Sequence, residues 1–248
     1  MLINQLEELS MNAWPALQTN LYDGWVLRFA EGYTKRANSI NPIYESTIDL
    51  DEKIDYCQRQ YSFCNLPTVF KLTTESYPKG IDNRLKERGY SRIDETSVRI
   101  LDMSQYAYHV PNGINIETKF SDEWIDGFFR CSNIFDKGVQ VKARKILGNI
   151  LGDVICVTKH IDEEVVGCGF GAIERGYAGI FDIVVEKSHR GNGYGRDIMN
   201  SILSEALNMG ITTANLQVVV GNTPAENLYN KLGFSEVYRY WYRKLDKY

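Results

Sequence analysis

The sequence is poor in residues that bind metals or form disulfides. Five cysteines are scattered through 248 residues without a Cys-x-x-Cys pair, and there are three histidines. Neither a metal site nor a disulfide framework is therefore expected to organise the fold, and the odd number of cysteines fits a reducing compartment. We expect a cytoplasmic protein without a metal cofactor.

Long apolar runs and an excess of basic residues are missing as well. No stretch approaches the roughly 18 apolar residues that a membrane-spanning helix needs. The segment 1–15 lacks the basic and then apolar regions of a secretory signal. The formal net charge is −4, so no global positive field is available to hold nucleic acid. We therefore expect neither a membrane nor a nucleic acid as a partner.

The composition is otherwise that of a globular protein. Hydrophobic residues make up 44% and charged residues 24% of the chain, as in proteins with a full core. By length the chain holds one large domain or two of about 120 residues. Proline and glycine punctuate the segment HVPNGIN at 109–115, and the pattern restarts after it. We predict two domains, residues 1–110 and residues 114–248.

The second half alternates between strand and helix patterns. Apolar residues recur at helical spacing over 194–208, directly after a glycine-rich loop. Thr223 is expected to cap a short helix that has Pro224 in its first turn and ends at Gly233. The other expected elements are strands at 114–120, 154–161, 164–173, 178–185, 215–220 and 235–245 and helices at 122–134 and 141–150.

The first half contains a partial copy of the second. GYSRIDETSVRILD at 89–102 aligns without a gap with GFSEVYRYWYRKLD at 233–246, and a strand and a short helix precede each segment. Nothing in the first half resembles the glycine-rich loop, and Leu85 stands where the second half has Tyr229. We expect the first half to be degenerate, serving as a scaffold or as one wall of the substrate site.

A polar segment of the first half, TKRANSI at 34–40, has two alternative interpretations. Polar residues at adjacent positions are unusual in a strand with one buried and one exposed face. The segment is therefore either a solvated strand and turn or part of a cleft that contacts the molecule on which the protein acts. The residues concerned are Arg36, Asn38 and Ser39, with Trp25, Tyr33 and Tyr44 as candidate walls.

The segment HRGNGYGRD at 189–197 predicts an anion site. Glycines let the backbone approach a phosphate closely, and the N-terminus of the next helix adds unpaired N–H groups and a positive dipole end. A P-loop is excluded because no lysine follows the glycines. A dinucleotide-binding turn remains a weak alternative, because the glycine spacing differs and no carboxylate ends the next strand.

Two motifs in the second half resemble those of the GCN5-related N-acetyltransferase (GNAT) superfamily. Arg190, Gly193 and Gly195 match its motif Arg/Gln-x-x-Gly-x-Gly/Ala, and LQVVVGNTPAENLYNKLGF at 216–234 resembles its second motif. The resemblance implies an α/β (α+β) fold with a mixed central sheet flanked by helices. The first half then resembles the degenerate copy of bacterial tandem members.

The resemblance implies acetyl-CoA as the acetyl donor. Backbone groups of Ile183, Val184 and Val185 would hold its pantetheine arm, and an amide there would polarise the thioester carbonyl. Asn222 matches an asparagine that bonds the pantetheine in relatives. The residues expected around the pyrophosphate are Arg190, Gly191, Asn192, Gly193, Tyr194, Gly195 and Arg196.

The catalytic groups are also inferred from the resemblance. Tyr229 matches a tyrosine that protonates the departing thiolate, which a phenol is able to do. The family's base has no clear match, because its usual places correspond to Gln217 and Gly179. Asp182 is the nearest carboxylate and Glu174 another.

Together these features predict an N-acetyltransferase that transfers an acetyl group to a primary amine by direct attack in a ternary complex. The acceptor, a small molecule or a peptide, cannot be named from the residues, and a homodimer is left open. The alternative is a non-catalytic acyl-CoA-binding sensor or regulatory protein, which the missing base favours and the presence of Tyr229 in its motif opposes.

Overall fold

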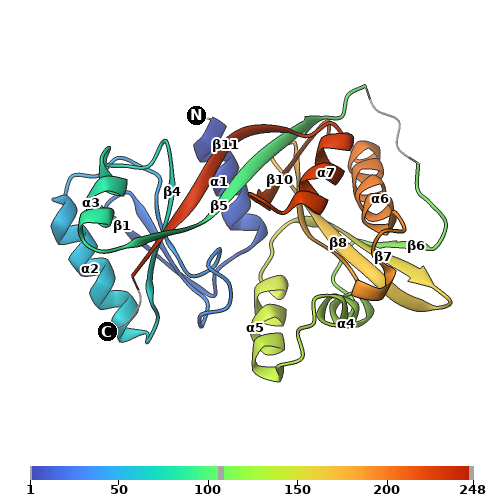
Figure 1. Cartoon of the computed structure of the whole chain (residues 1–248), viewed down its shortest axis with the longest axis horizontal. Helices are drawn as coiled ribbons and strands as arrows, with labels where there is room; N and C mark the ends of the chain where they lie inside the picture. Colours follow the sequence, from blue (N-terminus) through green and yellow to red (C-terminus); the bar gives the residue numbers. More distant parts are fainter. Residues whose placement is uncertain (1, 106–108, 246–248) are drawn as a thin grey trace. The chain divides into compact units, whose positions relative to one another are not determined.

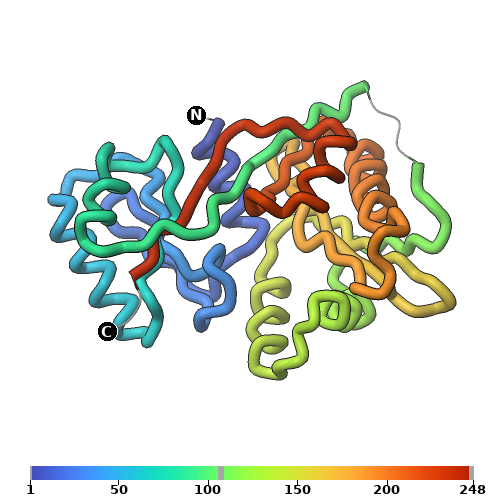
Figure 2. The backbone as a smooth tube through the Cα atoms, in the orientation of Figure 1, coloured from blue at the N-terminus to red at the C-terminus, as the bar shows by residue number. Residues whose placement is uncertain are grey.

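The computed structural model describes residues 2–105 and 109–245, and the remaining residues are drawn in grey in Figure 2. The chain divides into two compact units. One consists of residues 1–97 and 238–248, and the other of residues 98–237. Each unit has its own hydrophobic core and is described separately.

The first unit is a mixed sheet with helices packed on it. Its strands follow the order β1-β2-β3-β4-β11, antiparallel except where β3 runs parallel to β4. Its core is rich in aromatic residues, including Trp25 and Phe70, whose rings meet edge to face. The elements are α1 (Leu2–Ala13), β1 (Gln18–Tyr22), β2 (Trp25–Phe29), β3 (Ile40–Pro42), α2 (Leu50–Phe63), β4 (Thr68–Thr73) and α3 (Ile81–Glu87), with parts of β5 (Ser91–Asp102) and β11 (Ser235–Leu245).

The last strand of each sequence half crosses the boundary between the units. Strand β5 begins in the first unit and ends in the second, whereas β11 begins in the second and ends in the first. Accordingly β4 pairs with β11, and β5 is the neighbour of β10. The domain bounds 1–110 and 114–248 stay a prediction, because the two compact units do not show which segments fold independently.

The polar segment at 34–40 is buried in the first unit from Ala37 to Ile40, whereas Lys35 is exposed. The Asn38 carboxamide oxygen accepts hydrogen bonds from the backbone N–H groups of Ala30 (2.8 Å) and Gly32 (3.0 Å). Its nitrogen donates to two carbonyls of the same loop. Asn38 and Ser39 are buried, so the interpretation of these two residues as solvated is wrong. The Asn38 side chain holds the loop together.

The second unit is a six-stranded mixed sheet covered by helices on both faces. The strands follow the order β5-β10-β9-β8-β7-β6, in which β9 and β10 are parallel. Helices α6 and α7 share one core cluster, while α4 and α5 lie on the other side of the sheet (Figure 1). The elements are β6 (Ile114–Glu117), α4 (Asp122–Cys131), α5 (Lys137–Gly148), β7 (Asp153–Ile161), β8 (Glu164–Glu174), β9 (Tyr177–Val185), α6 (Tyr194–Asn208), β10 (Thr213–Val219) and α7 (Thr223–Lys231).

Alternate glycines on β8 bring α6 close to the sheet. A Cβ atom at Gly167 would lie 3.0 Å from the Cδ1 atom of Ile198, and one at Gly171 would lie 2.8 Å from the Cγ2 atom of Ile202. Such approaches leave no room for a side chain. The sequence GCGFG in β8 therefore fixes the position of α6, and with it the position of the loop that precedes α6.

Most of the expected elements are confirmed, some of them to the residue. The helix at 194–208 and the strand at 235–245 have the predicted bounds. Helix α5 begins earlier than expected because Asp136 accepts a hydrogen bond from the Val139 N–H (2.9 Å) and so caps the helix at that point. The prediction that Thr223 caps α7 is wrong, because Asn222 occupies the N-cap position.

Candidate active site

Strands β9 and β10 separate near their carboxyl ends. Their parallel ladder runs from Tyr177 opposite Thr213 to Ile180 opposite Leu216, and it ends there. Strand β9 continues to Val185, so its last five residues extend beyond the ladder pairs with β10. An extended, peptide-like ligand can pair with such a strand edge.

A bulge redirects β9 where the two strands separate. The pairing of β8 with β9 passes from Phe170–Phe181 to Cys168–Val184, so two residues of β9 stand opposite Gly169. One of them, Asp182, has a φ of 51°, in the left-handed region. A bulge of this kind bends a strand and re-aims its side chains, which fits a strand that must leave its partner.

The glycine-rich loop is open and leads directly into α6. Gly191 and Gly193 both have a φ of 85°, and a Cβ atom at either position would meet nothing within 4 Å. Gly193 is the N-cap of α6 and supplies no side-chain hydrogen bond to the first turn. The first N–H groups of α6 and the positive end of its dipole are therefore directed at an accessible loop, as an anion site requires.

Two polar side chains brace this loop. The Arg190 Nε atom donates to the carbonyl of Val185 (3.0 Å), and the Asn192 carboxamide donates to the carbonyl of His189 (3.2 Å). Arg190 therefore ties the loop to the end of β9, a role that the motif alone does not reveal. The Arg196 backbone N–H bonds to the Gly193 carbonyl (2.8 Å), and its side chain is exposed.

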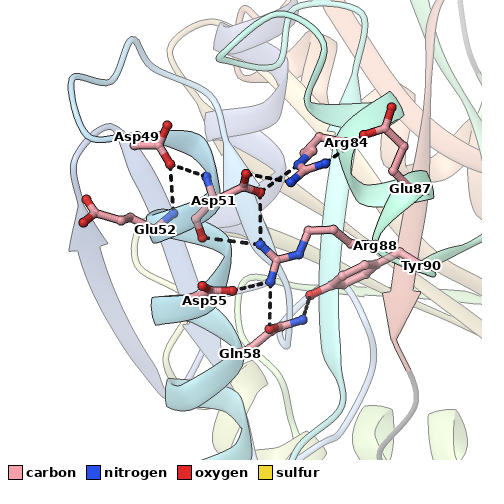
Figure 3. Close-up of polar contacts among 9 residues, drawn as sticks. All are labelled: Asp49, Asp51, Glu52, Asp55, Gln58, Arg84, Glu87, Arg88 and Tyr90. Atoms are coloured by element: carbon pink, nitrogen blue, oxygen red, sulfur yellow. Dashed lines mark hydrogen bonds and ion pairs between the residues drawn. The ribbon is translucent and has the colours of Figure 1, made fainter.

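The corresponding helix end of the first unit is closed by the protein's own carboxylates. When the ungapped alignment of 89–102 with 233–246 is extended towards the N-terminus, Asp49, the N-cap of α2, takes the position of Gly193. Its carboxylate accepts hydrogen bonds from the N–H groups of Asp51 (2.9 Å) and Glu52 (3.2 Å), as Figure 3 shows. A carboxylate of the chain itself therefore occupies at α2 the place that α6 leaves open.

Tyr229 projects from α7 into the core of the second unit. Its side chain is 9% exposed and packs against Phe234. Burial raises the pKa of the Tyr229 phenol to about 12; the nearby Asp182 carboxylate adds to this, and Arg99 opposes it. Tyr229 is therefore protonated at neutral pH and able to donate, with one acidic and one basic side chain in its surroundings.

The candidate bases differ in position. Glu174 pairs with Tyr177 at the start of β9, far along the strand from the point of separation. Gln217 lies on β10 just beyond the last ladder pair, but its carboxamide cannot take up a proton. Asp182 lies at the bulge, near Tyr229, with its Oδ2 atom buried. Of these candidates, Asp182 is the carboxylate nearest to the proposed acid.

Arg99 is a residue of this region that the sequence reasoning missed. It lies on β5, and its Nη1 atom donates to the Asn230 Oδ1 atom (2.5 Å) on α7, one residue after Tyr229. The signal was present in the sequence, because Arg99 is one of the residues that the two repeat segments share. Asn222, in contrast, is exposed, and its side chain does not cap α7.

Comparison with known proteins identifies the family. Residues 2–243 match the family described as "Probable histone acetyltransferase Rv0428c C-terminal". The chain belongs to this family and to the GNAT superfamily, and its class of activity is that of an acyltransferase, N-acetyl transfer in general. The predicted family, fold class and enzyme class are confirmed.

Individual relatives and structures agree with this assignment. The "Uncharacterized N-acetyltransferase YobR" of Bacillus subtilis (strain 168) is 29% identical over 97% of this chain and 98% of that protein. A "Streptothricin acetyltransferase" of Escherichia coli is 33% identical over 34% of this chain and 48% of its own length. A GCN5-related N-acetyltransferase from Kribbella flavida superposes with a TM-score of 0.74 at 13% identity, covering 99% of this chain and 96% of that one. A tandem GNAT protein from the clavulanic acid biosynthesis pathway superposes with a TM-score of 0.65 at 13% identity, over 97% of this chain and 87% of that one.

Within residues 2–105 and 109–245, no helix has both the length and the apolar character that crossing a membrane demands. Among the same described residues, no cluster of three or more histidine, cysteine, aspartate or glutamate side chains is arranged to hold a metal ion.

Proposed function

We propose that this chain transfers the acetyl group of acetyl-CoA to a primary amine within a ternary complex. The observation that carries the proposal is the continuity of three features in the second unit. Strand β9 runs beyond its ladder with β10 to Val185, Arg190 ties that strand end to the glycine-rich loop, and the loop opens at the N-terminus of α6, where Gly193 supplies no side-chain cap. This path offers backbone partners for the pantetheine arm and then N–H groups for the pyrophosphate.

The reaction forms a C–N bond and breaks a C–S bond. The nitrogen lone pair of the neutral amine attacks the thioester carbonyl carbon, and backbone N–H groups near Val184 stabilise the oxyanion. Collapse of this intermediate expels the CoA thiolate. The Tyr229 phenol donates its proton to the sulfur, a role for which its protonated state at neutral pH is suited.

Asp182 is the proposed acceptor of the proton that the amine nitrogen loses. Because Asp182 lies near Tyr229, the proton can return through water from Asp182 to the Tyr229 phenolate, which restores both groups. The net change is one proton moved from nitrogen to sulfur. Asn222 and the loop residues from Gly191 to Arg196 are proposed to bind CoA and to take no part in proton transfer.

Calorimetric titration with acetyl-CoA, with NADH as the control ligand, tests the donor. Release of free CoA thiol in the presence of an amine panel then tests transfer. The panel includes streptothricin and a lysine-containing histone peptide, because the names of one relative and of the matched family point to these classes.

Micromolar binding of acetyl-CoA alone, with thiol release that depends on an amine, is the expected result. Binding without thiol release for any amine would favour a non-catalytic acyl-CoA sensor, a function compatible with Gln217 and Gly179 at the usual places of the base. Absence of acetyl-CoA binding by folded protein, freed of carried-over CoA, would contradict the proposal.

A further inference from the structure

An arginine from a strand holds the helix next to it in each unit. In the second unit, Arg99 on β5 donates to Asn230 (2.5 Å) and forms an ion pair with Glu226 (3.7 Å), both on α7. The Arg99 side chain is 9% exposed. A guanidinium this buried has little freedom to move, so it fixes the helix that it binds.

In the first unit, Arg243 on β11 does the same for α3. Its Nε and Nη2 atoms donate to the two carboxylate oxygens of Asp82 at 2.8 and 2.9 Å. Its Nη1 atom donates to the carbonyl of Tyr90, just beyond the helix (3.2 Å). This side chain is 8% exposed.

We call each of these contacts, Arg99 with Glu226 and Asn230 and Arg243 with Asp82, a clamp. The two clamps occupy equivalent positions of the internal repeat. The ungapped alignment pairs Arg99 with Arg243, and extended towards the N-terminus it pairs Glu226 with Asp82 and Tyr229 with Leu85. The helix ends match as well, since the N–H of Phe234 bonds the Tyr229 carbonyl (3.0 Å) as the N–H of Tyr90 bonds the Leu85 carbonyl (3.0 Å). The same contact is therefore present in both units, and of the two helices α7 carries a phenol whereas α3 does not.

We propose that Arg99 is the positioning residue of the proposed acid. By binding Glu226 and Asn230 on either side of Tyr229 in the sequence, it sets the rotation and depth of α7 and so the position of the phenol. Its positive charge also lowers the cost of the phenolate that forms when Tyr229 gives up its proton. This inference rests on the proposed role of Tyr229.

The equivalent clamp of the first unit provides a matched control. The change Arg99→Met breaks the clamp that holds the phenol, whereas Arg243→Met breaks the one that holds Leu85. Each variant is first checked for folding by near-UV circular dichroism. If Arg243→Met does not fold, Asp82→Asn weakens the same clamp from the helix side.

Two measurements report on the position of the Tyr229 phenol. The first is the NMR resonance of Tyr229 in protein labelled at tyrosine Cζ, assigned with Tyr229→Phe and independent of any acceptor. It is expected to shift in Arg99→Met and to stay in place in Arg243→Met. The second is turnover with the best amine of the panel, or hydrolysis of acetyl-CoA if no amine reacts. We expect kcat to fall about 10- to 100-fold in Arg99→Met, since small misplacements cost rate, with the KM for acetyl-CoA unchanged.

A double-mutant cycle separates positioning from general damage. In the Tyr229→Phe background, Arg99→Met is expected to cause no further loss, because its effect passes through the phenol. Additive losses, or equal resonance shifts in Arg99→Met and Arg243→Met, would overturn the positioning role. A wild-type chain that binds acetyl-CoA but turns nothing over would contradict the proposed function instead, while the resonance still reports on the clamp.

Discussion

The sharpest test of the anion site is the substitution that makes α6 resemble α2. In Gly193→Asp the new carboxylate stands at the N-cap of α6, as Asp49 does at that of α2. Because a Cβ atom at Gly193 meets nothing within 4 Å, the side chain fits without displacing neighbours. The left-handed backbone of Gly193, unlike that of Asp49, does not favour a side-chain cap. The strain of an aspartate there should lower the free energy of unfolding by about 1–2 kcal/mol.

The effect on acetyl-CoA is expected to be much larger. A carboxylate about 4 Å from a phosphate charge costs about 4 kcal/mol at an effective dielectric constant of 20, which is about a 1000-fold loss of affinity. Gly193→Asn is the neutral control of nearly the same shape, and it should keep most of the affinity. Calorimetry measures both variants beside the wild type, with urea unfolding as the check on folding. Wild-type affinity in Gly193→Asp would refute the assignment of this loop to the pyrophosphate.

Four further changes test other parts of the argument. Tyr229→Phe should lower kcat and leave acetyl-CoA binding intact, and unchanged turnover would remove the phenol from the mechanism. Lys71→Met should destabilise the protein by about 3 kcal/mol in urea unfolding, because the buried Glu7 carboxylate loses its cation at 2.6 Å and keeps the hydrogen bond from the Tyr238 hydroxyl (2.7 Å); adding Glu7→Gln should recover part of the loss. Thr158→Val should be neutral or stabilising by about 1 kcal/mol, because the buried Oγ1 atom accepts and donates no hydrogen bond within the described residues, and a clear loss of stability would contradict this. The hydrogen bonds from Arg243 lower the pKa of Asp82 in the folded state. The Asp82 carboxylate therefore stabilises the fold at pH values above its unfolded-state pKa of about 4, and this contribution is lost as the pH falls through its lower folded-state pKa. Asp82→Asn should make the urea midpoint depend less on pH between pH 6 and pH 2.5.

Local signals predicted the elements of the second unit well. Helical spacing and the glycines on either side define 194–208 to the residue, because the helix begins after one left-handed glycine and ends before another. The start of α5 was missed because its cap, Asp136, lies outside the apolar pattern that was used to find the helix. The sequence does not distinguish Thr223 from Asn222 as the cap of α7, because both residue types are common N-caps.

The anion loop was recognisable from sequence because its chemistry is contiguous. The environment of Tyr229 was not, because it combines Asp182 from β9, Arg99 from β5 and a helix from the second motif. The bulge that gives Asp182 a positive φ depends on the register between β8 and β9, and register follows from tertiary packing. The sequence offers Asp182 and Tyr229 as candidate residues, but it does not show that they lie near each other or near Arg99.

The exchange of the last strands places an arginine of each sequence half against a helix of the other half. Arg99 belongs to the first sequence half by its place in the repeat, yet it holds α7 of the second unit, and Arg243 of the second half holds α3 of the first. If selection retains the proposed acid, it must therefore retain a residue of the degenerate half, which cannot diverge freely at β5. The Asp49 cap of α2 belongs to the first unit and does not involve Arg99. On the proposed roles of Tyr229 and Arg99, the first half serves the site by supplying the strand that positions the helix bearing Tyr229.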